Sequence, residues 1–303
     1  MPVKNVNRGL TDTTPQLSIP DMNRWICTIA LGLVGACQIW AGSAADSFKE
    51  KKLDDFSSTR MSDWGDLALG IQHLKWKHGE SEHFIIHFFR SGERIARRSE
   101  VFYGEIKAFF GNRPDLLVGQ KSQVFAFNDA PDWKQFAGTI QKDWAGGVTR
   151  GDEFFYLTTN EKGQFDDRGK VQAHEMTHLI FNRFYRGHPP LWLNEGIAEY
   201  FSQRKIGALP QFRQQVILTP PYHLGQLFLT EEYPERPDQI QAFYTEAAVV
   251  VDFLTRTAER TTKLPKFVDA MIATNDITAA LQLYGYKDFA EFEKAYKNYR
   301  RHF

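Results

Sequence analysis

A histidine-glutamate motif near the middle of the chain constrains this sequence more than any other feature. Residues 174–178 read His-Glu-Met-Thr-His, the H-E-x-x-H pattern that is typical of zinc-dependent hydrolases. Residues four apart on a helix lie on the same face, so His174 and His178 can direct two imidazoles at one metal ion. Glu175 follows the first histidine directly, where it can act on a metal-bound water without being a ligand. The motif therefore predicts a helix with two metal ligands and a general base.

The third protein ligand that a catalytic zinc ion needs is expected from the next helix. Two prolines at 189–190 break the first helix and turn the chain back. The tripeptide Asn-Glu-Gly at 194–196 then begins sixteen residues beyond His178. We expect Glu195 to complete the ligand set. Glu199 follows one turn later on the same face, where a carboxylate can accept the free ring N–H of a ligating histidine.

An isolated H-E-x-x-H in a chain with nine histidines is also compatible with a solvated helix face. Here the motif is followed by a helix break and by N-E-G-x-x-E in the phase that a second helix requires. This combination favours a zinc (Zn²⁺) site over coincidence.

H-E-x-x-H followed by W-L-N-E-G resembles the gluzincin branch of zinc metallopeptidases, which includes thermolysin and the membrane alanyl aminopeptidases, and within it the bacterial peptidase MA-like proteins. The resemblance implies an α+β fold, a zincin-like (thermolysin-like) catalytic domain with an N-terminal sheet, the H-E-x-x-H helix and a helical C-terminal half. It implies that His174, His178 and Glu195 are the zinc ligands. It also implies that Glu175 is the general base and that Glu199 is the carboxylate that orients a ligating histidine. The motifs that carry the resemblance are confined to residues 171–201.

Two departures from the family pattern bear on these expectations. The gap from His178 to Glu195 is shorter than in the best-studied branches, which bears on the loop between them and leaves the ligands unchanged. The G-A-M-E-N exopeptidase motif is absent from the chain, and this argues against an aminopeptidase.

The implied function is a zinc-dependent peptidase, in particular an endopeptidase, that acts on peptide or protein substrates. Gluzincins supply a Tyr or His from the C-terminal half to stabilise the oxyanion. Tyr244 is the first candidate for this role and His223 the second, with a core aromatic as the alternative for Tyr244. An edge strand upstream of the zinc helix binds peptide in such enzymes, which suggests residues 146–149 or 154–157, unless these form an ordinary hairpin.

The competing hypothesis is a zinc-binding, non-catalytic protein that binds peptides on a protease scaffold. Glu175 favours the enzyme, because zinc binding alone does not require this carboxylate. A zinc hydrolase that acts on a non-peptide amide is a third possibility that the motif leaves open.

Three other histidines were candidates for metal binding and are assigned differently. His83 and His87 fall on one face of a strand predicted over residues 82–90, but residues four apart on a strand lie too far apart to share an ion. We therefore expect a polar strand face. His188 lies beside the two prolines, and we expect it to be exposed.

The composition limits the domain organisation and the class of partner. The chain has 303 residues, no net charge and 42% hydrophobic residues, enough for one large domain or two small ones. Zero net charge argues against a nucleic-acid-binding protein, which usually carries a basic excess. We expect a lead-in segment over residues 46–80 and the zincin-like domain over residues 81–303.

Residues 1–45 are predicted to be a leader that contains a signal peptide from about residue 22. Arg24 precedes an apolar run over residues 25–40, and small residues follow at 41–45. The protein is therefore expected to be exported, either to the periplasm or out of the cell. An uncleaved membrane anchor and a lipoprotein processed at Cys37 remain open, and both would attach the protein to a membrane. Cys27 and Cys37 are the only cysteines, so a cleaved chain has neither disulfide nor cysteine ligand.

Periodicity predicts the remaining elements. Strands are expected over 82–90 and 122–129 and a hairpin over 146–158. The region 206–240 is expected to be a loop. Helices are expected over residues 93–110, 132–141, 170–185, 191–203, 241–257, 266–274, 277–284 and 289–299.

Overall fold

The computed structural model describes residues 48–56, 61–72, 75–140, 145–160, 163–166, 168–205 and 209–303. The expected leader, with both cysteines, lies outside these residues, so the signal-peptide, anchor and lipoprotein hypotheses stay predictions. Within the part of the chain that is described, no helix combines the length and the apolar character needed to cross a membrane.

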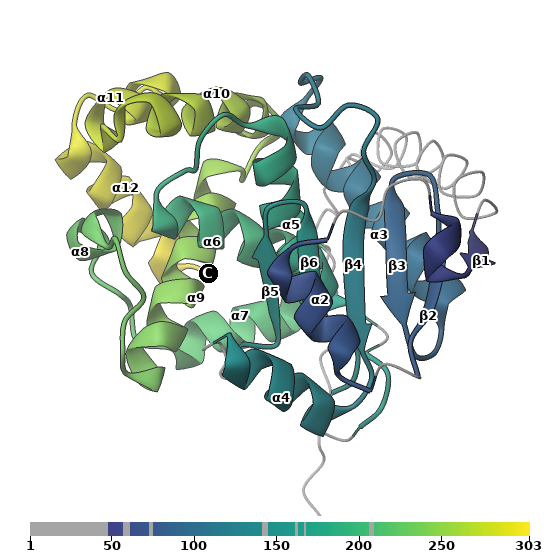
Figure 1. The fold of residues 1–303 in the computed structure, drawn as a ribbon. Coiled ribbons are helices and arrows are strands. Elements are labelled where there is room, and N and C mark those ends of the chain that lie inside the picture. Colours follow the sequence, from purple (N-terminus) through teal and green to yellow (C-terminus); the bar gives the residue numbers. More distant parts are fainter. Residues whose placement is uncertain are drawn as a thin grey trace, which may run out of the picture. The chain divides into compact units, whose positions relative to one another are not determined.

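Six strands form one mixed sheet in the N-terminal half (Figure 1). β3, β4 and β6 run parallel to one another, whereas β1, β2 and β5 pair antiparallel with their neighbours. β5 therefore forms one edge of the sheet and β1 the other. In their order across the sheet, the strands are β1 (Lys49–Lys51), β2 (Lys77–Glu80), β3 (Phe84–Phe88), β4 (Ser122–Phe127), β6 (Glu153–Leu157) and β5 (Gly147–Arg150).

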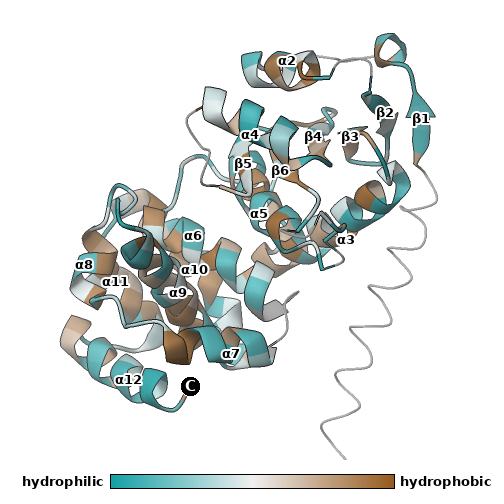
Figure 2. Ribbon diagram, turned by 90° about the horizontal axis from the view of Figure 1, so that it is seen from below, coloured by the Kyte–Doolittle hydropathy of each residue, from teal (hydrophilic) through white to brown (hydrophobic). Residues whose placement is uncertain are grey.

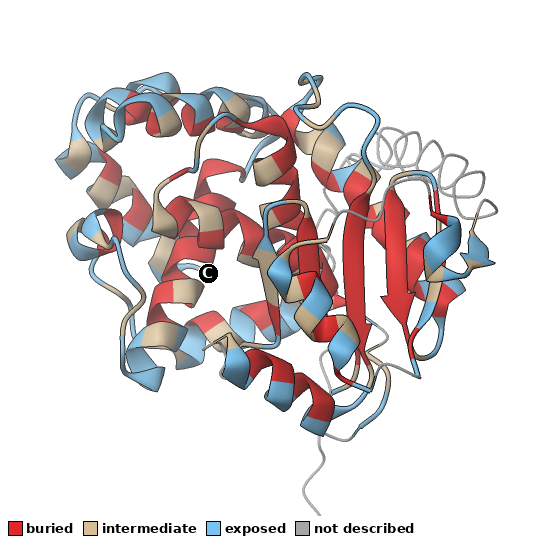
Figure 3. Cartoon of the chain, viewed as in Figure 1, coloured by how far each residue is buried: buried red, intermediate tan, exposed pale blue. Residues whose placement is uncertain are grey.

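Helices cover both faces of this sheet (Figure 2). Along β4, Val124 and Ala126 pack against one helical layer and Phe125 and Phe127 against the other, because successive side chains on a strand alternate between faces. The central strands are consequently apolar on both faces and almost entirely buried (Figure 3). The first layer consists of α3 (Gly92–Phe110) and α5 (Lys170–Phe184), and the second of α2 (Asp63–Gly70) and α4 (Ala130–Thr139).

The C-terminal half is helical and is built around α9 (Figure 1). Residues 245–254 of α9 are all buried, including the polar side chains of Thr245, Glu246 and Asp252. Glu246 is held from α12 by the Tyr296 hydroxyl (2.5 Å) and Arg300 Nε (3.2 Å). The elements are α6 (Leu191–Glu199), the π-helical η2 (Tyr200–Lys205), α7 (Leu209–Leu218), α8 (Leu224–Leu229), α9 (Pro237–Leu254), α10 (Ala258–Thr274), α11 (Ile277–Leu281), η3 (Gln282–Tyr284) and α12 (Phe289–Arg301).

The expected α+β class is confirmed, but residues 46–80 and 206–240 differ from the sequence expectations. Residues 46–80, expected as a lead-in segment, contain β1, η1 (Leu53–Asp55), α2 and β2, so a domain boundary at residue 80 would cut through the sheet. The expectation of a loop over 206–240 is wrong, because α7 and α8 lie there. Among the side chains of α7 that the structure describes, only Phe212 and Val216, one turn apart, are buried, and such a short pattern gives little periodic signal.

The polar strand face expected for His83 and His87 is wrong for His87, which is fully buried in β3. Its ring stacks on Phe125 at 4.4 Å between centroids. Nε2 lies 2.9 Å from Gln123 Oε1, and Nδ1 lies 2.8 Å from His78 Nδ1. Burial lowers the pKa of His87 to about 3, so this imidazole is neutral. His83 is partly exposed, and its Nδ1 lies 2.7 Å from Glu100 Oε2.

Candidate metal centre

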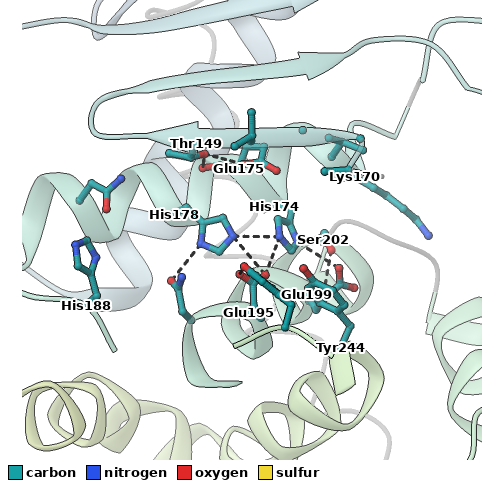
Figure 4. Close-up of a pocket in the computed structure, with 18 of the residues that line it drawn as sticks. Thr149, Lys170, His174, Glu175, His178, His188, Glu195, Glu199, Ser202 and Tyr244 are labelled. Atoms are coloured by element: carbon teal, nitrogen blue, oxygen red, sulfur yellow. Dashed lines mark hydrogen bonds and ion pairs between the residues drawn. The ribbon is translucent and has the colours of Figure 1, made fainter. Parts of the chain in front are cut away.

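The H-E-x-x-H residues lie on α5, as the motif predicts. Asp166 Oδ2 accepts the N–H of Lys170 (3.1 Å) at the start of this helix. One side of α5 packs on the sheet through buried apolar residues, which leaves His174 and His178 on the side that faces α6 (Figure 4). The turn after α5 ends at Pro190, whose carbonyl accepts the N–H groups of Leu193 and Asn194 in α6.

Glu195 on α6 meets the two imidazoles of α5 (Figure 4). The two Nε2 atoms of His174 and His178 lie 3.1 Å apart. Glu195 Oε2 lies 3.2 Å from His174 Nε2 and 3.5 Å from His178 Nε2. A tetrahedral zinc ion with bonds of about 2.0–2.2 Å separates its ligand atoms by roughly 3.3 Å. The three atoms therefore form a triangle of the size that a tetrahedral metal ion requires.

The carboxylate oxygen in this triangle, Glu195 Oε2, has no hydrogen-bond partner within the described residues. Glu195 is only 2% exposed, and within the described residues its Oε2 accepts no well-aligned hydrogen bond. It lies within ion-pair distance of both Nε2 atoms. An orphaned buried oxygen beside two imidazoles fits a divalent cation, and the His-His-Glu set is one that zinc uses.

Each of the three side chains that form the triangle contacts one further side chain that orients it. Glu199 Oε1 lies 3.2 Å from His174 Nδ1, where the sequence predicted this carboxylate. His178 Nδ1 lies 3.1 Å from Asn194 Oδ1. Tyr233 donates its hydroxyl proton to Glu195 Oε1 at 2.6 Å. Sequence reasoning missed the roles of Asn194 and Tyr233, although Asn194 belongs to the quoted N-E-G motif.

The charges of the centre are strongly coupled. Burial lowers the pKa of His174, but the nearby carboxylates of Glu195 and Glu199 outweigh it and raise the pKa well above its ordinary value. Burial raises the pKa of Glu195, but the charges of His178 and His174 outweigh it and lower the pKa far below its ordinary range. Glu195 is therefore ionised. Its negative charge is balanced by positive charge on the two histidines, which a metal ion can supply in place of their protons.

Glu175 points away from α6 toward the edge strand β5 (Figure 4). Thr149 donates its hydroxyl proton to Glu175 Oε2 at 2.7 Å. The backbone of Gly147 lies so close that an added Cβ would stand 2.7 Å from Glu175 Cγ. Glu175 is 5% exposed, and burial raises its pKa, which makes the carboxylate a stronger base than an exposed glutamate.

A cleft of about 1000 Å³ opens over these residues. Tyr244 lines it, with its ring centroid 6.2 Å from that of His174. Tyr244 also packs partly buried against the core, so both sequence interpretations of this residue find support. His188 lies on the wall of the cleft and is exposed, as expected. His223 is exposed and precedes α8, and it is not among the residues that line the cleft.

The two hairpin strands differ in their capacity to bind an added peptide. β6 pairs with β4 on one side and β5 on the other, so the proposal for residues 154–157 is wrong. β5 pairs only with β6 among the described strands, and Gly147, Val148 and Thr149 line the cleft. Of the two suggested segments, the one at 146–149 has a free edge beside Glu175.

No protein-family model matches the chain, and no curated protein matches it either. The assignments at this centre therefore rest on the side chains themselves and on their geometry.

Proposed function

We propose that the protein is a zinc-dependent peptidase of the gluzincin type, with a zincin-like catalytic domain. The observation that carries this proposal is the triangle of His174, His178 and Glu195 with an orphaned carboxylate oxygen, next to a buried Glu175 in an open cleft. A metal-binding triangle alone would suit a structural site. The oriented carboxylate beside it is what supports hydrolysis.

The residues of the chain divide the work of peptide hydrolysis among them. His174, His178 and Glu195 would hold zinc, which when bound would act as a Lewis acid that polarises a carbonyl and lowers the pKa of water. Glu175 removes a proton from the attacking water and delivers it to the leaving amine. Thr149 keeps one oxygen of Glu175 engaged, so the other oxygen, Oε1, is the one proposed to carry this proton.

Substrate binding and oxyanion stabilisation are assigned to the walls of the cleft. The free edge of β5 at 146–149 is proposed to bind the peptide backbone by strand addition. Tyr244 is proposed to donate its hydroxyl to the oxyanion, because it lines the cleft beside His174. Endopeptidase activity is favoured, because the chain lacks the exopeptidase motif of the related aminopeptidases.

We also propose that the protein is exported, to the periplasm or beyond, on the strength of residues 22–45. Membrane attachment through this segment or through a lipidated Cys37 is the alternative to cleavage. Mass spectrometry of the N-terminus of the protein from its own cells distinguishes a cleaved chain, a lipidated cysteine and an intact anchor.

A non-catalytic zinc-binding protein that binds peptides is the alternative function. It would use the same triangle and the same free strand edge. It gives no role to the burial of Glu175 or to the hydrogen bond from Thr149, and these contacts favour the enzyme.

The deciding experiment is cleavage of an unfolded protein substrate by the purified, zinc-loaded protein, with Glu175→Gln as its matched variant. We expect the parent to cleave and the variant to bind zinc equally but not to cleave. Equal cleavage by both proteins would remove Glu175 from the mechanism. Zinc bound to both proteins with no cleavage by either would favour the peptide-binding alternative.

A further inference from the structure

The two oxygens of Glu195 have different partners. Oε2 faces the imidazoles of His174 and His178 and accepts no well-aligned hydrogen bond within the described residues. Oε1 accepts the hydroxyl proton of Tyr233 at 2.6 Å. Tyr233 lies between α8 and α9, 38 residues after Glu195, so a separate part of the chain holds the carboxylate from behind.

Tyr233 is itself held in place by aromatic packing. Its ring stacks on Tyr244, with centroids 6.2 Å apart and planes inclined by 25°. The edge of Phe243 lies against it, with centroids 6.5 Å apart. Both neighbours belong to α9, which is buried along most of its length. The Tyr233 hydroxyl therefore reaches Glu195 from a rigid support.

The distinction between the two oxygens matters for metal binding. A carboxylate can bind a metal ion through one oxygen or through both. Binding through both would use the position that a catalytic zinc ion keeps open. A phenol is a protonated donor at neutral pH, so Tyr233 engages Oε1 and leaves Oε2 as the available ligand atom.

We infer that Tyr233 is a positioning residue that holds Glu195 Oε1 away from the metal ion and reserves Oε2 as a one-oxygen ligand. The inference rests on the proposed zinc site but not on the proposed peptidase activity. It predicts that removal of a single hydroxyl, at a residue that binds no metal, changes both the affinity and the coordination of the ion.

The test compares Tyr233→Phe with the parent in the full protein. Zinc affinity is measured by competition with a chromogenic chelator, and the cobalt(II)-substituted proteins are compared by visible absorption. We expect zinc to bind about 10- to 100-fold more weakly in the variant, the usual cost of losing a partner of a metal ligand. We also expect weaker cobalt absorption, because a carboxylate bound through both oxygens raises the coordination number above four.

Tyr222→Phe is the matched control. Tyr222 also packs on Phe243, at 6.0 Å between ring centroids, and it does not line the cleft of the metal centre. The same loss of a phenolic hydroxyl at this position is expected to leave zinc affinity and the cobalt spectrum unchanged. Thermal unfolding of the metal-free proteins distinguishes the loss of the hydrogen bond to Glu195 from a general loss of stability.

The outcomes are distinct. Weaker zinc binding and an altered cobalt spectrum in Tyr233→Phe, with metal-free stability close to that of the parent, support the inference even if no protein cleaves peptides. Parental affinity and spectrum in the variant overturn it. A loss of affinity that the unfolded fraction fully explains also overturns it, as does a parent that binds no zinc.

Discussion

At the scale of single residues, the position of Glu175 depends on the absence of a side chain at Gly147. A Cβ at this glycine would lie 2.7 Å from Glu175 Cγ and 2.8 Å from both Glu175 Oε1 and Val171 Cγ1, which is closer than real contacts allow. Gly147→Ala is therefore expected to displace the carboxylate and to lower kcat/KM about a hundredfold. Zinc content is expected to stay at the parental level, because Glu175 is not a ligand.

The control for this substitution is Gly138→Ala, because an added Cβ there meets nothing within 4 Å. Peptide cleavage and zinc stoichiometry are measured for both variants. Parental activity in Gly147→Ala would mean that the edge strand does not determine where Glu175 lies.

The proposed oxyanion donor is tested by Tyr244→Phe. Loss of one such donor typically lowers kcat about 10²- to 10³-fold. Zinc content is expected to be unchanged, because Tyr244 packs beside His174 and is not one of the proposed ligands. Steady-state kinetics and metal analysis check this expectation. Full activity in the variant would leave Tyr244 with a packing role only.

His87 makes a prediction about pH. Its folded pKa of about 3 lies below the ordinary value of 6.5, so below pH 6.5 the unfolded chain binds a proton that the folded protein does not. Stability contributed by the neutral imidazole is complete above pH 6.5 and is lost as the pH falls from there toward 3. At pH 5 the loss is about 2 kcal/mol.

Urea unfolding at pH 7.5 and pH 5 measures this loss in the parent and in His87→Leu. The variant is expected to be less stable at both pH values, because the hydrogen bond between residue 87 and Gln123 is lost, but to lose about 2 kcal/mol less on acidification. An identical pH dependence in the two proteins would show that another group is responsible.

The residues that could be predicted from sequence are those whose spacing on one helix determines their direction. His174, Glu175 and His178 belong to this class. Thr149 and Tyr233 do not, because Thr149 precedes its partner Glu175 by 26 residues and Tyr233 follows Glu195 by 38. No helical or strand period relates such positions, so their contacts appear only once the sheet edge and α9 are placed.

At the scale of elements, the packing of α6 on α9 determines where Glu195 lies. Gly196 allows this close approach, because an added Cβ would stand 2.7 Å from the Ala247 carbonyl oxygen. Gly196→Ala is expected to separate the helices and to cost about 1–3 kcal/mol of stability. It should also weaken zinc binding, since Glu195 is the preceding residue.

Urea unfolding of the metal-free protein and chelator competition measure these two effects. Gly70→Ala in α2 is the control, because an added Cβ there has nothing within 4 Å. A Gly196→Ala variant with parental stability and zinc affinity would contradict the proposed dependence of Glu195 on this helix contact.

Long apolar runs in the sequence predict some elements, whereas other elements have no such run and could not be predicted in this way. β4 is buried along its whole length, and α9 is buried without interruption over residues 245–254. β1 has no buried side chain, and α7 has two among those that the structure describes. Such elements are stabilised by contacts with neighbouring elements, with β2 for β1 and with α9 for α7. Their own sequences therefore give little indication of their secondary structure.

At the scale of the molecule, the candidate metal centre joins the two halves of the fold. α5 packs on the sheet and carries two of the proposed ligands, whereas α6 packs on α9 in the helical half and carries the third. The N-terminal sheet and the helical C-terminal half that the family resemblance implied are both present (Figure 1).

This arrangement predicts that zinc stabilises the fold as a whole. An ion that binds only the folded protein adds about 4 kcal/mol when its free concentration is a thousand times its Kd. Chelation is therefore expected to lower the Tm of the zinc-loaded protein by roughly 10 °C, measured by scanning calorimetry. Glu195→Gln should lose most of this difference, whereas His223→Ala, outside the cleft, should keep it. An unchanged Tm on chelation of the parent would mean that the triangle binds no zinc in the folded state, because a bound ion that bridges the halves must add to the free energy of unfolding.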